Sequence, residues 1–230
     1  MTGVQTCALP ICALGFWLPE NFNAPYSAIG FSDFWRRWHI SLSSWLRDYL
    51  YIPLGGNRLG VVRTYVALTL TMLLGGLWHG AAWTFVAWGG LHGLYLVLER
   101  LLTPTLTKMS ARQSRPLAVL LRGSAWLLTL LLVMFAWVWF RAADSAQAIA
   151  MCAHMLAPNL NSISDLSAQS KLMVSGFLVL IALQLAQRRF QLLARVQKLP
   201  AIFLGLLLGM LLTAIVLSPG NARAFIYFQF

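Results

Sequence analysis

Charged residues are scarce in this sequence. Only 10% of its 230 residues are Asp, Glu, Lys or Arg, and 59% are hydrophobic. A soluble domain averages about 25% charged residues, so the shortage excludes an ordinary soluble globular protein. We therefore interpret the chain as a membrane protein that has the lipid bilayer as its surroundings.

Acidic residues are the scarcest charged class. Six Asp and Glu stand against 17 Lys and Arg, which gives a formal net charge of +11. In a soluble protein this balance would suggest nucleic acid. Here the basic residues cluster in the gaps between apolar segments, which is typical of topology signals and of contacts with anionic lipids. We expect no nucleic-acid partner.

Cysteine and the common catalytic motifs are also lacking. The three cysteines, Cys7, Cys12 and Cys152, show no metal-ligand spacing with histidines and form no even-numbered framework, so they indicate neither a metal site nor disulfides. The sequence holds no G-x-S-x-G nucleophile elbow, no P-loop and no zinc signature. What remains is an enzyme whose polar machinery is a histidine, or a transport protein in which a histidine relays protons.

Long uncharged runs are present instead. No charged residue occurs from Thr64 to Leu98, a run of 35 residues. As one helix this run would be roughly 52 Å long, far beyond a hydrocarbon core of about 30 Å, so it must fold back on itself. Gly75, Gly76 and Gly80 bracket the predicted break, and His79 lies at the junction.

The predicted fold is an all-α polytopic membrane protein. About five transmembrane helices are expected, over residues 59–78, 81–100, 116–140, 171–187 and 200–217. The basic loops around Lys108 and Arg195 are expected to face the cytoplasm, as the positive-inside rule requires. The loop that holds Asp165 is then expected outside.

Two further helices are expected to lie in the membrane interface. After Ser32, which is a good N-cap, apolar side chains recur at three- and four-residue steps; this predicts one amphipathic helix that ends in the turn at Pro53. Residues 145–156 also show helical spacing. This segment is too short to span, so we expect a short interfacial or re-entrant helix.

Histidine supplies the candidates for chemistry. A polar ring at residue 79, among small and apolar residues, needs either a catalytic task or a hydrogen bond to a neighbouring helix, and both readings stay open. His39 is placed on the interfacial helix, and Asp48 is expected to form an ion pair with a nearby arginine. His92 is expected to hydrogen-bond between helices, and His154 to lie at the surface or interface.

A haem protein is an alternative reading of two histidines on spans. Membrane cytochromes of this kind need two axial histidines on each of two spanning helices. His79 and His92 are 13 residues apart. That step turns roughly 220° at about 100° per residue, so the two rings do not share a helix face. The spacing therefore argues against haem.

Two long motifs resemble the membrane-bound O-acyltransferase superfamily, and within it the bacterial alginate O-acetyltransferase branch. They are FWRRWHISLSSWLRDYLYIPLGGNR and, about twenty residues later, LLGGLWHGAAWTFVAWGGLHG; the terminal FIYFQF also fits that branch. Members of the superfamily are longer, with more spans before the first motif. The resemblance therefore assigns residues 13–230 to the C-terminal half of such a domain. Residues 1–12 are expected to be a non-native leader.

The resemblance implies a function and a site. His79 corresponds to the presumed catalytic histidine and His39 to the upstream histidine of the WHISLS motif. The implied enzyme is an O-acetyltransferase of the bacterial inner membrane. It passes an acyl group from a cytoplasmic thioester donor, such as acetyl-coenzyme A, across the membrane for O-acetylation of an exported polysaccharide such as alginate. No tightly bound cofactor is expected. A periplasmic acetyltransferase and the exopolysaccharide machinery are the implied partners. The alternative is a proton-coupled transporter of polysaccharide precursors that uses His79 as a relay.

Overall fold

The structure is a computed structural model that describes residues 19–110, 114–157 and 167–192, together with isolated positions between 195 and 213. All regular structure in these residues is helical, which confirms the predicted all-α fold class. The chain divides into two units, Met1–Leu185 and Ala186–Phe230. The four histidines all belong to the first unit. The predicted leader at residues 1–12 lies outside the described residues.

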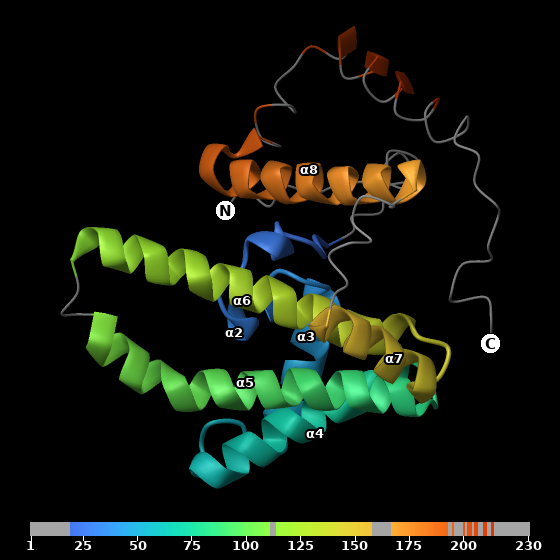
Figure 1. Ribbon diagram of the computed structural model, residues 1–230. Coiled ribbons are helices and arrows are strands. Elements are labelled where there is room, and N and C mark those ends of the chain that lie inside the picture. Colours follow the sequence, from blue (N-terminus) through green and yellow to red (C-terminus); the bar gives the residue numbers. More distant parts are fainter. Residues whose placement is uncertain are drawn as a thin grey trace. The chain divides into compact units, whose positions relative to one another are not determined.

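A helical hairpin forms the centre of the first unit (Figure 1). Helix α4 (Val61–His79) and helix α5 (Trp83–Ser110) lie side by side, so the long uncharged run folds back as predicted. The bend is at Gly80, whose φ of 157° is rarely adopted by other residues. Its N–H donates to the carbonyl of Leu77 at 3.1 Å and so closes the last turn of α4.

Glycines allow the two helices of this hairpin to approach closely. A Cβ atom on Gly76 would lie 2.3 Å from the carbonyl oxygen of Phe85, and one on Gly89 would lie 2.4 Å from that of Met72. Small residues at such a crossing let backbones pack directly against each other. The contact therefore fixes where each residue of α4 lies against α5.

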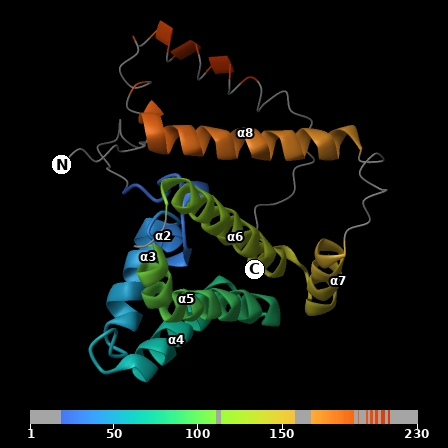
Figure 2. The same ribbon diagram turned by 60° about the vertical axis from the view of Figure 1, so that its left-hand side comes forward.

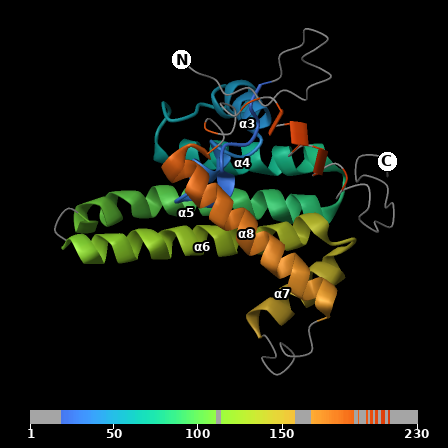
Figure 3. The same cartoon turned by 90° about the horizontal axis from the view of Figure 1, so that it is seen from above.

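Helix α6 (Arg115–Arg141) returns along α5, and helix α7 (Ser145–Leu156) follows it (Figures 1 and 3). The ends of α7 are those predicted from the sequence. Asp144 is its N-cap and accepts from the N–H of Gln147 at 2.8 Å. The Gln147 side chain accepts in turn from the N–H of Ala143 at 2.8 Å. This reciprocal pair satisfies backbone groups at the start of the helix.

Within the described residues, three helical segments are long and apolar enough to cross a membrane. They are α4, α6 and residues 170–190 of helix α8 (Ala168–Phe190). Helix α5 has 28 residues, but tryptophans, glycines and a histidine lower its hydropathy. Much of the predicted span at 200–217 lies outside the described residues. Five crossings therefore stay a prediction.

The expectation of one amphipathic helix from residue 31 onwards is wrong. The segment forms two short helices, α2 (Phe31–Trp35) and α3 (Ile40–Leu46), and a π-helical turn η2 (Arg47–Tyr51) follows. The chain breaks between α2 and α3 at His39, whose backbone is left-handed with φ 43° and ψ 57°. The N-cap of α2 is Gly30 and not Ser32. Contacts with other helices override the local periodicity here.

Aromatic residues of α2 pack against α4, α5 and α6 to form the core of this unit. Figure 2 shows α2 and α3 beside α5, and α2 contacts it directly. The buried members of this core include Phe31, Phe34, Trp35, Met72, Trp88, Tyr95, Val133 and Ala136. An interfacial helix would expose such rings on one face. Instead they are buried, and they hold the His39 segment against the hairpin.

Substitution of Gly76 by Ala is expected to destabilise the hairpin. The added methyl group would collide with the Phe85 carbonyl, and overpacking of this kind costs about 1–3 kcal/mol. The measurement is thermal unfolding of the purified protein in detergent. Gly123→Ala on α6 is the matched control, because nothing lies within 4 Å of its added Cβ. Equal unfolding temperatures for the two variants would contradict the packing described here.

Candidate active site

His79 lies at the bend of the hairpin, inside a cage of aromatic rings. It is the last residue of α4 and is only partly exposed. Its ring centroid is 4.9 Å from that of Trp78, 5.0 Å from Phe140 and 5.4 Å from Trp88, and the last two rings stand nearly perpendicular to it. Phe85 lies further away at 6.3 Å. Helices α4, α5 and α6 each contribute to the cage, which surrounds the imidazole with apolar surface.

His39 occupies the break between α2 and α3. Its left-handed backbone is uncommon for a residue other than glycine and costs of the order of 1–2 kcal/mol. Bonds on both sides hold it, because Ile40 N–H donates to the Asn21 carbonyl at 3.0 Å and Ser43 N–H donates to the His39 carbonyl at 2.9 Å. The Nδ1 atom is buried and has no hydrogen-bond partner among the described residues. Strain and an unpartnered nitrogen together are typical of a functional position.

The structure brings these two histidines into the same region. The C-terminal end of α6 contacts both neighbourhoods: the Trp137 ring lies 5.0 Å from that of Trp38, beside His39, and Phe140 contacts His79. Trp137 and Phe140 are one helical turn apart. No hydrogen bond joins the two imidazoles in the described chain.

His92 does not form the predicted interhelical hydrogen bond with any described residue. It is completely buried, and both of its ring nitrogens lack a hydrogen-bond partner in the part of the chain that the structure describes. Its ring instead packs against aromatic rings whose centroids lie 4.9–6.2 Å away, those of Phe34, Trp35, Trp88 and Tyr95. The predicted interhelical hydrogen bond is therefore replaced by aromatic packing.

The other polar candidates lie apart from the two histidines. Asp48 pairs with Arg47 at 2.7 Å, as predicted, and the hydrogen bond from Arg47 lowers the pKa of the Asp48 carboxyl. Both side chains are exposed, so the pair contributes little to stability. His154 is an exposed residue of α7, which agrees with its predicted surface role.

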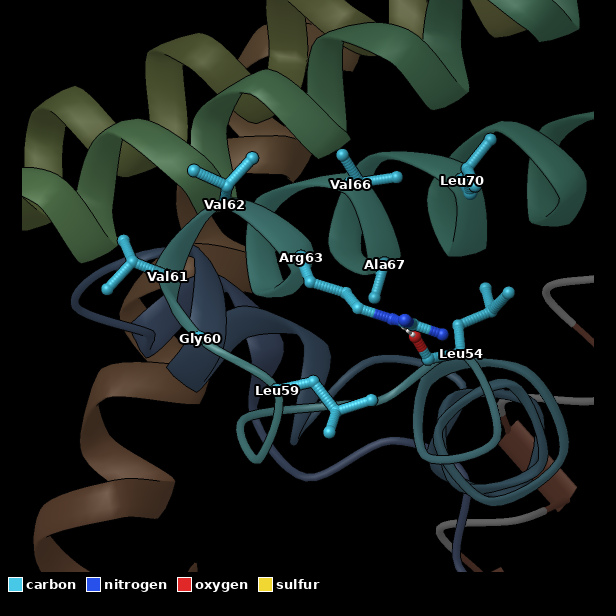
Figure 4. A pocket seen from close by; sticks show the side chains of 9 residues that line it. All are labelled: Leu54, Leu59, Gly60, Val61, Val62, Arg63, Val66, Ala67 and Leu70. Carbon is cyan, nitrogen blue, oxygen red and sulfur yellow. Dashed lines mark hydrogen bonds between the residues drawn. The ribbon is translucent and has the colours of Figure 1, made fainter.

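A large groove on α4 contains neither histidine. It has a volume of about 620 Å³, and its apolar lining residues include Val62, Val66 and Leu70. Arg63 also lines it, and its Nε donates to the Leu54 carbonyl at 3.2 Å (Figure 4). Because no nucleophile or base lines it, we do not place the chemistry there.

A second cavity borders the His39 segment. Its volume is about 390 Å³, and its lining comes from α2, α3, η2, α4 and α5. Its basic and hydroxyl-bearing lining residues include Arg36, Arg47, Ser43 and Ser44. Its apolar lining residues include Leu68, Met72 and Leu96. The cavity therefore offers basic and apolar surface together.

The fold and site define a helical membrane protein with a caged histidine at the bend of a tight hairpin. The sequence matches the membrane-bound O-acyltransferase family over residues 7–142. The chain therefore belongs to this family.

Curated relatives carry acyltransferase names. The chain is 50% identical over 154 residues to the "probable alginate O-acetylase AlgI" of Azotobacter vinelandii, a match that covers 67% of this chain and 29% of the relative. Identity to the Pseudomonas aeruginosa protein of the same name is 47% over 174 residues, or 75% of this chain and 32% of that one. The peptidoglycan O-acetyltransferase of Helicobacter pylori is 44% identical over 153 residues, 66% of this chain and 28% of the relative. The matched region thus spans about a third of each relative.

The sequence did not indicate which residues surround the histidines. Trp88 is one of ten tryptophans, and Phe140 is the last residue of a predicted span. A signal for Trp88 was available, because it precedes His92 by one helical turn and so shares its face of α5. Phe140 gave no such signal, since only the return of α6 along α5 brings it to His79.

Replacing His92 by Phe is expected to leave stability unchanged or to raise it. An unpartnered buried polar group costs about 1–3 kcal/mol, and Phe keeps the ring without the nitrogens. His92→Ala should instead cost about 3 kcal/mol or more, because it leaves a cavity. Thermal unfolding measures both, with His154→Phe at an exposed position as the control. A loss of stability in His92→Phe as large as that in His92→Ala would show that a polar partner exists.

Proposed function

We propose that this chain carries the catalytic histidine of a membrane O-acyltransferase, an O-acetyltransferase that uses His79 as a general base. The observation that carries the proposal is that His79 and the segment around His39 both contact the same end of α6, in a family named for acyl transfer. The two residues are 40 positions apart along the chain, with His39 at the break between α2 and α3 and His79 at the end of α4.

The chemistry at His79 follows from its surroundings. Aromatic rings from three helices surround the imidazole, and in its neutral form this ring can accept a proton. His79 takes the proton of an acceptor hydroxyl while the hydroxyl oxygen attacks the thioester carbonyl carbon. The new C–O bond forms, the C–S bond breaks, and the proton passes from His79 to the departing thiolate. The products are an O-ester and a free thiol.

His39 serves the donor in this proposal. The next residue along the chain, Ile40, lines the cavity to which Arg36 and Arg47 also contribute. Guanidinium groups bind phosphate oxygens, so this surface suits a phosphate-bearing thioester such as acetyl-coenzyme A. From here His39 orients the donor or polarises its carbonyl. We propose that the donor is a substrate and that no cofactor is tightly bound.

The direction of transfer and the acceptor are further parts of the proposal. Positively charged loops favour the cytoplasm, which supports a cytoplasmic donor side, and the relatives are named for alginate and peptidoglycan. We propose that the acyl group crosses the bacterial inner membrane for O-acetylation of an exported polysaccharide such as alginate. A periplasmic acetyltransferase and the exopolysaccharide machinery would then be the partners.

The test uses a chimera in which this chain replaces the matching part of the Azotobacter vinelandii relative. Membranes containing the chimera are incubated with acetyl-coenzyme A labelled in the acetyl group, and the label is followed into a partner protein or polymer. His79→Ala should lower transfer by about 10²- to 10⁴-fold, which is the usual contribution of general acid–base catalysis. His79→Gln should be nearly as inactive, because an amide hydrogen-bonds but takes up no proton at neutral pH.

His39→Ala is expected to act differently in the same assay. Because His39 serves donor binding, its loss should appear partly as a raised KM for the donor. Substantial activity in His79→Gln would favour a packing role for His79. Loss of kcat alone in the His39 variant, with an active His79 variant, would reverse the two assignments. No acetyl transfer by the unaltered chimera would support a proton-coupled transporter instead.

A further inference from the structure

Glu99 reaches from α5 to the start of α2. One of its carboxylate oxygens, Oε2, accepts from the backbone N–H of Phe31 at 2.6 Å and from that of Ser32 at 2.9 Å. The backbone of Gly30 passes so close that a Cβ atom there would lie 2.8 Å from the other oxygen, Oε1. Hydrogen bonds to a carboxylate are about twice as strong as neutral ones, and a negative charge is favourable at the start of a helix.

Glu99 is the charged member of a larger clamp. The N–H of Gly30 donates to the hydroxyl of Thr129 on α6 at 2.9 Å, and the N–H of Ile29 donates to Asp33 of α2 itself at 3.1 Å. Every backbone N–H from residue 29 to residue 32 thus has a side-chain acceptor. Among these acceptors, Glu99 alone brings a carboxylate from another helix of the described chain.

Helix α2 lies along one face of α5. Trp88, His92, Tyr95 and Glu99 recur at the steps that place residues on the same helix face. Phe31 stacks on Tyr95 at 4.7 Å, and Trp35 contacts both His92 at 5.1 Å and Trp88 at 5.8 Å. Helix α2 therefore runs antiparallel to α5, with Glu99 at one end of the contact and Trp88, which touches His79, at the other.

Helix α2 cannot hold its own position. With five residues it has little more than one turn, and so short a helix is not stable alone. It nevertheless leads directly to His39: Asp33 pairs with Arg37 at 2.9 Å, and the Arg37 carbonyl accepts from Asn23 N–H at 2.9 Å. The placement of α2 along α5 therefore decides where His39 lies.

We propose that Glu99 is a positioning residue, which clamps the start of α2 to α5 and thereby sets His39 against His79. This inference rests on the proposed function, in which both histidines act. Glu99 itself lies at the far end of the α2–α5 contact and does not touch the reacting groups. Its effect on transfer passes through His39.

A double-mutant cycle in the chimera tests this route. Glu99→Ala is expected to raise the KM for acetyl-coenzyme A and to lower kcat/KM by about tenfold, whereas in a His39→Ala background it should change kcat/KM by less than about twofold. Arg100→Gln, at the exposed neighbouring position, is the control and should match the unaltered chimera. Independent, additive losses from Glu99 and His39 would overturn the proposal.

Rescue of Glu99→Ala by an added carboxylate tests whether the carboxylate of Glu99, and not only the packing of its side chain, holds α2. Formate is small enough to fill the space that Glu99→Ala leaves and can accept the same N–H groups, so it should restore donor KM, while chloride at equal ionic strength should not. Absence of rescue in a folded Glu99→Ala variant would contradict the clamp. If that variant does not fold, Glu99→Gln, which keeps an acceptor oxygen without the charge, should show the same donor KM defect at a smaller size; a Gln variant indistinguishable from the unaltered chimera would overturn the proposal.

One readout does not depend on activity. The Nδ1 atom of His39 is buried, so release of α2 should speed the reaction of His39 with diethylpyrocarbonate several-fold, as measured by mass spectrometry of the His39 peptide. Arg100→Gln should leave the rate unchanged. An unchanged rate in Glu99→Ala would refute positioning by Glu99 even if the unaltered chimera transferred no acetyl group, a result that by itself would count only against the proposed function.

Discussion

The close approach of the α4 and α5 backbones is the constraint from which the rest of the unit follows. Gly76 and Gly89 leave no room for a side chain between the two helices, so their relative position is fixed by main-chain contact. The hairpin must then turn at Gly80, and His79 is held at its bend. Interiors packed in this way transmit position well, because they do not deform continuously. A histidine on a loop would lack such a fixed place.

The second consequence of this packing is that one face of α5 is left for α2. That face carries the rings of His92 and Tyr95 and, one turn further, the carboxylate of Glu99. The aromatic side chains of α2 pack on those rings, and the first backbone N–H groups of α2 donate to the carboxylate. Apolar burial supplies most of the contact, while the polar end supplies direction and register. His79 and α2, the helix that leads to His39, both pack on this same face of α5.

The sequence predicted the parts of the fold that depend on local chemistry. An uncharged run too long for one crossing, with glycines in its middle, predicts a hairpin, and a short apolar segment after Asp144 predicts α7. The break at His39 could not be predicted from local sequence chemistry. Apolar side chains recur at helical steps across it, yet backbone bonds to Asn21 and Asn23 and the clamp at residues 29–32 impose a different path.

The residues of the candidate site also differ in how far the sequence could predict them. His79 stands out in the sequence because an ionisable ring in an apolar run needs a cause, and the resemblance assigned both histidines before the structure placed them together. Glu99 gave little signal, because a carboxylate beside Arg100 at the end of a predicted span looks like an ordinary boundary residue. His92 was misread, since a buried polar ring usually finds a partner and this one is packed by aromatic rings instead.

The clamp also sets an order of assembly during synthesis. Phe31 leaves the ribosome 68 residues before Glu99, and Gly30 precedes Thr129 by 99 residues. At roughly 5–20 residues per second, several seconds pass in which α2 has been made but its acceptors have not. His39 therefore takes its place only after both helices of the hairpin and most of α6 exist. A nascent chain thus has His39 and His79 in their final surroundings only after the helices around them have been made.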